Sequence, residues 1–169
     1  MNAPAVCYKD FAAKRAAYPR EVIPSIFGSA ADACLNSVAL TEWLSDNALF
    51  TYPRGVDQLA ALHEAARRGK YRKAAQPCDT LQPVEVTLEQ GAPCSGWACV
   101  LGAALTALGY AWRLVTAGDE QDPYRHVYVQ AFHGGKWYTL DPKGSQRGQD
   151  FGRDKAPEVY PVTARWRRR

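Results

Sequence analysis

Two neighbouring segments in the second half of the chain alternate apolar and polar residues, and this pattern predicts a β-hairpin. In residues 126–131, Val127 and every second residue after it are apolar and share one face of the strand, while His126 starts the polar face. A second strand is predicted over Lys136–Leu140, and a Gly-Gly pair between the segments is typical of a tight turn.

The turn decides which residues of the hairpin face each other. If His133-Gly134 is a two-residue loop, Asp141 lies directly opposite His126. If Gly134-Gly135 is the loop, Asp141 faces Tyr128 and is the diagonal neighbour of His126 on the same face. Either register brings the carboxylate within reach of the imidazole, whereas a three-residue loop separates them.

An apolar segment at residues 97–108 predicts a helix that is buried on several sides. Pro93 fits only at or before its first turn, so Cys94 lies at the helix N-terminus. There the unpaired N–H groups and the helix dipole favour a thiolate. Gly96 leaves room for another segment to approach, and Cys99, more than a turn inside the helix, is interpreted as a core residue.

The remaining pattern predicts helices in the first half of the chain and one more strand after the apolar helix. The predicted elements are a short helix at 9–17, a helix at 29–49 with Ser29 as its N-cap, a helix at Val56–Arg68, a loop at 70–83 near the candidate site described below, a partly extended segment at 80–88 and a strand at 112–116. His63 lies on one face of the third of these helices. No carboxylate partner is placed beside it, so a structural role is expected rather than that of a competing base.

A thiol, an imidazole and a carboxylate in this order are the groups of a nucleophile, its base and the group that orients the base. Cys94, His126 and Asp141 are therefore the candidate catalytic residues. A metal site built from cysteines and histidines is not expected, because there is no Cys-x-x-Cys pair and the histidines do not have ligand spacing on one element. No cofactor is expected either.

The same motifs resemble the transglutaminase-like superfamily, the broad papain-like group of cysteine proteases, amidases and acyltransferases. The resemblance lies in Pro-Cys-Ser-Gly-Trp-Ala, Ala-Leu-Thr-Ala-Leu-Gly-Tyr, Trp-Arg-Leu-Val-Thr-Ala, His-Val-Tyr-Val and Gly-Gly-Lys-Trp-Tyr-Thr-Leu-Asp-Pro. It implies an α+β fold with a papain/transglutaminase-like core, in which N-terminal helices and a central helix pack on an antiparallel sheet. Residues 1–169 then form a single domain, with its catalytic-type core at about 83–142.

By this resemblance the protein is a cysteine-dependent acyl-transfer enzyme of the protease, amidase or transglutaminase type. Cys94 is then its nucleophile, His126 the base and Asp141 the orienting group. A protein or peptide amide is the implied substrate. The backbone N–H of Cys94, Gln82 and Gln90 are candidate donors for an oxyanion. The alternative is a structural or assembly protein, such as a bacteriophage virion or tail component, that keeps the fold without catalysis.

The composition bears on where in the cell the protein is expected to be found. No run of about twenty apolar residues predicts a membrane span, and the N-terminus lacks the pattern of a secretory signal. The five cysteines are odd in number and irregularly spaced, which argues against a disulfide framework and for cytoplasmic synthesis, with virion association if the alternative holds.

Charge is concentrated at the C-terminus. The basic tail, residues 153–169, contains six Lys/Arg and two Asp/Glu, while the whole chain has a net charge of +4. Its last residues, from Arg165 to Arg169, suit an acidic protein surface in an assembly or the phosphates of a nucleic acid, or else form a solvated end. The acidic loop at 118–123 is expected mainly to keep that loop solvated.

Overall fold

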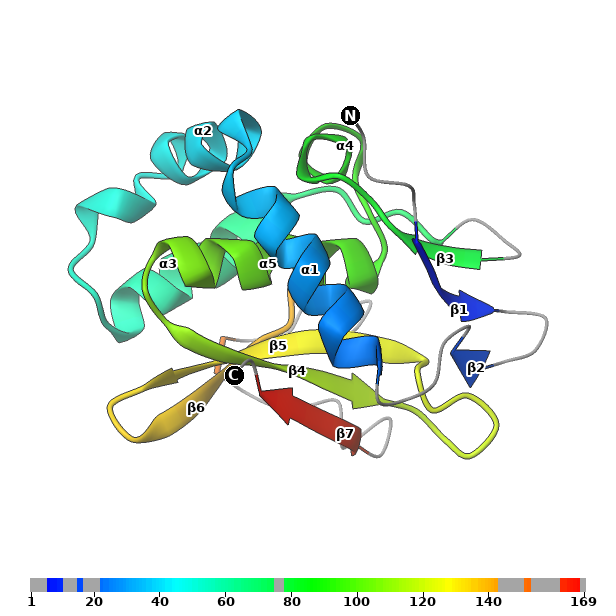
Figure 1. Ribbon diagram of the computed structural model, residues 1–169. Helices are drawn as coiled ribbons and strands as arrows, with labels where there is room; N and C mark the ends of the chain where they lie inside the picture. The colour runs from blue at the N-terminus through cyan, green and yellow to red at the C-terminus, as the bar shows by residue number, and fades with distance from the viewer. Residues whose placement is uncertain are drawn as a thin grey trace.

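A buried helix, α5 (Cys94–Ala107), forms the centre of the fold. The computed structural model describes residues 6–10, 15–16, 22–74, 78–142, 151–152 and 162–167. Figure 1 shows α5 above the larger sheet, with α1 crossing α5. All residues of α5 from Ser95 to Leu105 are buried, as expected of a helix that is apolar on every side.

The elements that surround α5 follow the chain from a small N-terminal sheet through helices to the larger sheet. They are β1 (Val6–Asp10), β2 (Arg15–Ala16), α1 (Ile23–Leu35), α2 (Val38–Asp46), the 3-10 helix η2 (Leu49–Thr51), α3 (Val56–Arg68), β3 (Cys78–Leu81), α4 (Val84–Gln90), then, after α5, β4 (Ala111–Ala117), β5 (His126–His133), β6 (Lys136–Leu140) and β7 (Val162–Arg167). This mixture of helices and antiparallel strands confirms the predicted α+β class.

The larger sheet has the strand order β6-β5-β4-β7 and is antiparallel throughout. In the β5–β6 hairpin, His133 pairs with Lys136, so Gly134-Gly135 is the two-residue loop. Both glycines have positive φ, 55° and 81°, as a type I′ turn requires. The second of the two predicted registers is therefore the one observed, and it puts Asp141 diagonal to His126.

The end of the chain contributes an edge strand. Within the basic tail, β7 pairs antiparallel with β4, and Arg165 lies opposite Val115. The backbone of residues 162–167 is thus part of the sheet rather than a solvated end. The rest of the tail lies outside the described residues, as do the side chains of β7, so the expectation of a phosphate or protein partner stays a prediction.

Three local predictions in the first half of the chain were wrong, and Val56–Arg68 was right to the residue. Of the predicted helix at 9–17, the described residues 9–10 and 15–16 belong to β1 and β2 instead, because β1 pairs with β3, a partner far away in the sequence. The helix predicted at 29–49 is two helices, α1 and α2, and the first begins at Ile23 with proline in its first turn, where proline is tolerated. The loop predicted at 70–83 is interrupted by β3, whose last two residues, Thr80 and Leu81, are the extended part of the segment predicted as partly extended at 80–88; most of the rest of that segment is the helix α4.

The cysteines depart from expectation as well. Cys7 and Cys78 form a disulfide between β1 and β3, with a Cα–Cα distance of 5.7 Å. The odd number of cysteines therefore did not exclude a disulfide bond. Cys34, Cys94 and Cys99 are free thiols. Among the described residues, no single helix is long and apolar enough to cross a membrane; α1 and α2 pass that test only together, and they are bent by 76°.

Candidate active site

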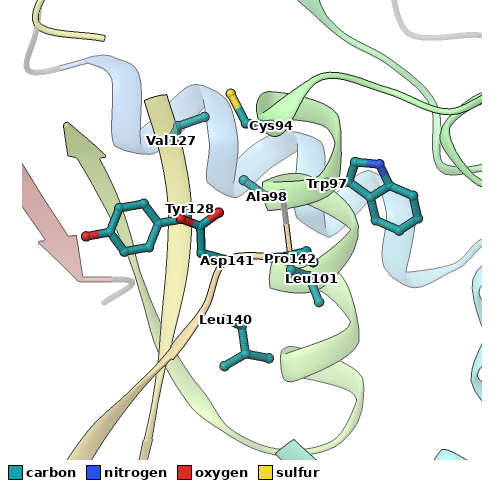
Figure 2. Close-up of a pocket in the computed structure, with 9 residues that line it drawn as sticks. All are labelled: Cys94, Trp97, Ala98, Leu101, Val127, Tyr128, Leu140, Asp141 and Pro142. Atoms are coloured by element: carbon teal, nitrogen blue, oxygen red, sulfur yellow. The ribbon is translucent and has the colours of Figure 1, made fainter. Parts of the chain in front are cut away.

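Cys94 is the first residue of α5, as predicted. Pro93 is the N-cap residue and has extended backbone, and because proline has no N–H it leaves no donor unsatisfied at this position. Figure 2 shows the Cys94 thiol at the start of the helix, beside β5. Cys94 is partly exposed while Cys99 is buried, so the two thiols of this helix differ in access as expected.

Gly96 lets the preceding segment pack tightly against the first turn of α5. A Cβ atom at this position would lie 2.5 Å from the Cβ of Ala92 and 3.2 Å from the Oγ1 of Thr87. Any side chain would therefore push the end of α4 and the residues after it away from Cys94. The predicted close approach at Gly96 is confirmed.

His126 and Asp141 form a buried pair. The Nε2 atom of His126 lies 2.7 Å from Oδ2 of Asp141, and both side chains are buried. The pair joins the first residue of β5 to the residue after β6, through the diagonal register of the hairpin. Because Nε2 is engaged by the carboxylate, Nδ1 is the ring nitrogen left for the thiol.

The electrostatics of this pair favour a charged imidazole. Burial alone lowers the pKa of His126, but the negative charge and hydrogen bond of Asp141, together with the neighbouring Cys94, outweigh burial and hold that pKa well above its ordinary value. The ring also stacks on Tyr128, with 5.5 Å between centroids. A cation held against a cysteine at a helix N-terminus is the arrangement that stabilises a thiolate.

His63 lies close to Asp141. It is buried in α3, its Nε2 atom has no hydrogen-bond partner among the described residues, and Asp141 is near enough to act on its pKa. Burial lowers the pKa of His63 and so favours the neutral ring. His63, for which a structural role was expected, thus lies next to the candidate site. Its position depends on the packing of α3 beside β6, which the local sequence does not reveal.

A family model now places these three residues in context. The model of the transglutaminase-like superfamily matches residues 38–142, which include Cys94, His126 and Asp141. The chain belongs to the transglutaminase-like superfamily. No curated protein matches it. A solved structure described as "Crystal structure of a TGase" is similar with a TM-score of 0.48 and 15% identity, over 82% of this chain and 36% of that one.

A small cavity extends from the Cys94 thiol toward Asp141. It is bounded by α5, β5 and the end of β6, and Figure 2 shows the residues that line it. Its walls are mostly apolar, with Trp97, Ala98 and Leu101 on the helix side. The space between Cys94 and Asp141 is therefore mostly apolar.

A second buried acid lies beneath the start of α5, and the sequence did not single it out. Asp79, in β3, accepts a hydrogen bond of 2.7 Å from the hydroxyl of Ser95, the residue after Cys94. Both residues are buried. Nearby, the ammonium of Lys9 contacts Asp122 at 2.7 Å and the carbonyl of Tyr124 at 3.2 Å. The Asp79–Ser95 contact ties the first turn of α5 to the small N-terminal sheet.

Replacing Asp79 by asparagine tests how the charge of Asp79 affects the stability of the fold. Burial raises the pKa of Asp79 to about 6, although the hydrogen bond from Ser95 and the charge of Lys9 act to lower it. Because the folded state holds the proton more tightly than an unfolded carboxyl with a pKa of about 3.9, ionisation of Asp79 destabilises the fold as the pH rises from about 4 to 6. Asp79→Asn keeps an acceptor for Ser95 and removes the charge.

We therefore expect Asp79→Asn to be more stable than the wild type at about pH 7, by about 1–3 kcal/mol, with the difference shrinking toward pH 4. Thermal unfolding followed by circular dichroism at both pH values measures this. Equal destabilisation at both would show that the carboxylate is needed as a partner and contradict the prediction.

The two glutamines suggested as oxyanion donors are not joined to Cys94 by the contacts of the described residues. The side-chain oxygen of Gln82 is buried without a hydrogen-bond partner among them, and Gln90 is exposed at the end of α4. The backbone N–H of Cys94, in the open first turn of α5, remains the predicted donor.

Proposed function

We propose that this protein is a cysteine-dependent acyl-transfer enzyme that acts on the carbonyl of an amide. Cys94 is the nucleophile, His126 the proton carrier and Asp141 the group that orients and charges the imidazole. The observation that carries the proposal is the 2.7 Å contact between His126 Nε2 and Asp141 Oδ2, together with the effect of Cys94, at the start of α5, on the pKa of the same imidazole. Membership of the transglutaminase-like superfamily supports the same class of chemistry.

In the first half of the proposed reaction, the Cys94 thiolate attacks the carbonyl carbon and the carbonyl π electrons move to oxygen. The oxyanion faces the N-terminus of α5, where backbone N–H groups stabilise negative charge. The tetrahedral intermediate then collapses, the C–N bond breaks, and the His126 imidazolium gives its proton to the departing amine nitrogen. An acyl thioester on Cys94 and a neutral imidazole remain.

In the second half, neutral His126 takes a proton from the acceptor as the acceptor attacks the thioester carbonyl. The C–S bond breaks, and the thiolate and imidazolium are restored. Water as the acceptor makes the protein a protease or amidase, and an amine makes it a transglutaminase. Asp141 keeps its negative charge throughout and stabilises the imidazolium at each end of the cycle.

Acylation by p-nitrophenyl acetate tests the proposal without knowledge of the natural substrate. We expect release of p-nitrophenol with an acetyl group on Cys94, located by mass spectrometry after acid quench, and faster turnover when methylamine is added if amines are acceptors. Cys94→Ala should abolish this acylation, while Cys99→Ala, a matched change at a buried thiol of the same helix, should retain it. Acetylation at the same rate in Cys94→Ala would contradict the proposal.

A further inference from the structure

A basic segment lies beside the thiol and has no role in the proposed chemistry. Lys70, Tyr71, Arg72 and Lys73, which we call the basic lip, follow α3 and are all exposed. The sequence pattern predicted a loop over these residues. An exposed group of three cations with one aromatic ring is a surface that attracts anionic groups.

The lip is fixed to the residues that lead into α5. The backbone N–H of Arg72 donates to the carbonyl of Ala92 at 3.1 Å, and the N–H of Ala92 donates to the carbonyl of Lys70 at 3.3 Å. The same Lys70 carbonyl accepts a bond of 3.0 Å from the indole N–H of Trp97 in the first turn of α5. The lip therefore keeps one position relative to the start of this helix.

These contacts place the lip within electrostatic range of Cys94. Tyr71 forms a parallel β-bridge with Ala92, two residues before Cys94. Bridged backbones lie about 5 Å apart and two residues span at most about 7 Å, so the Cα atom of Tyr71 is within about 12 Å of the Cα atom of Cys94. Burial raises the pKa of Tyr71 to about 12, and the charges of Cys94 and Asp79 add to this effect.

The charges of the lip are available to a ligand. Within the described part of the chain, none of the lip's three cations forms an ion pair. In the acidic loop before β5, Asp119 pairs with Arg125 at 2.7 Å, and Asp122 pairs with Lys9 at 2.7 Å. Two acids of that loop are therefore engaged in ion pairs, and an approaching substrate meets the unpaired positive charge of the lip.

We propose that the basic lip binds the acidic part of a peptide acyl donor, so that preferred substrates carry aspartate or glutamate near the reacting amide. This inference rests on the proposed acyl transfer at Cys94. The cations orient the acidic side chains of the peptide, and Tyr71 offers a flat apolar surface between them. The attraction is screened by salt, because most of the lip is solvent-exposed.

The charge dependence of alkylation at Cys94 tests the lip directly. Iodoacetate and iodoacetamide attack the same thiolate and differ in charge, so the ratio of their rates at Cys94 reports the local field. We expect Lys70→Gln/Arg72→Gln/Lys73→Gln to lower the iodoacetate-to-iodoacetamide ratio by about threefold to tenfold, and about 1 M salt to lower the wild-type ratio similarly. Arg67→Gln/Arg68→Gln, which removes exposed charges from α3 instead, should keep the ratio.

A second pair of reagents tests the peptide. A chloroacetylated peptide with two glutamates should label Cys94 faster than the same peptide with two glutamines, and the lip variant should lose this difference. The inference would be overturned if the iodoacetate-to-iodoacetamide ratio of the lip variant were unchanged, whether or not both rates fell. Equal labelling rates for the two peptides would overturn it as well. If instead no reagent labels Cys94 faster than the buried cysteines, the proposed function is overturned.

Discussion

Replacing His126 with alanine is expected to slow the alkylation of Cys94 by iodoacetamide about 100-fold at about pH 6. Asp141 holds the pKa of His126 well above its ordinary value despite burial, so the wild-type ring is a cation beside the thiol. A free cysteine, with a pKa of about 8.5, has well under about 1% thiolate at this pH. Removing the cation should return Cys94 toward that ordinary reactivity, and the measurement is the pseudo-first-order rate of labelling, located by mass spectrometry.

His133→Ala supplies the matched control, since His133 lies at the other end of β5 and its ring packs against Tyr110. This variant should label at the wild-type rate. Circular dichroism confirms that both variants are folded. A His126→Ala protein that labels as fast as His133→Ala would mean that the imidazole does not activate the thiol.

Asp141→Asn should reduce acylation by p-nitrophenyl acetate by about 10²- to 10⁴-fold, the range expected when an orienting carboxylate loses its charge. Asparagine nearly matches the shape of Asp141, but it removes the charge that raises the pKa of His126. The buried ring then becomes neutral near pH 7, because burial favours the uncharged form. An amide that turns its NH₂ toward Nε2 also forces the proton onto Nδ1, the nitrogen that serves the thiol.

The expected pH dependence separates this role from a structural one. Because the folded-state pKa of His126 is raised, the imidazolium and its contribution to stability are present at low pH and are lost as the pH rises through that raised value. In Asp141→Asn this loss should come at lower pH. Asp119→Asn, an exposed carboxylate paired with Arg125, is the control and should acylate like the wild type. Acylation of Asp141→Asn within about threefold of wild type would show that the carboxylate is dispensable.

The pairing of His126 with Asp141 could be predicted from the sequence because both residues belong to one hairpin. His126 and Asp141 are joined by two short strands and one turn, so alternation alone put them on one face. The sequence left two registers open, since His133-Gly134 and Gly134-Gly135 both suit a tight turn. The observed turn uses the two glycines because each of its central residues needs positive φ, which glycine adopts without strain.

The surroundings of Cys94 were not predictable in this way because they depend on contacts between distant segments. The end of β1, at Lys9 and Asp10, was predicted to be helical, and the pairing of β1 with β3 is what brings Asp79 beneath Ser95. The basic lip falls within the loop that was predicted near the candidate site, but its bridge to Ala92, which fixes its position, could not be predicted from local pattern. Local patterns identified the reacting groups, and tertiary pairing determines what surrounds them.

The most direct test of a thiolate–imidazolium site compares the three free cysteines of the wild-type protein in one experiment. Burial raises the pKa of Cys34 to about 11 and that of Cys99 well above its ordinary value, so both thiols should label slowly. Alkylation with iodoacetamide is followed at each cysteine from about pH 5 to 9. We predict that Cys94 labels far faster than the other two and stays fast near pH 6. Labelling of Cys94 at the rate of Cys34 and Cys99 across this range would contradict it.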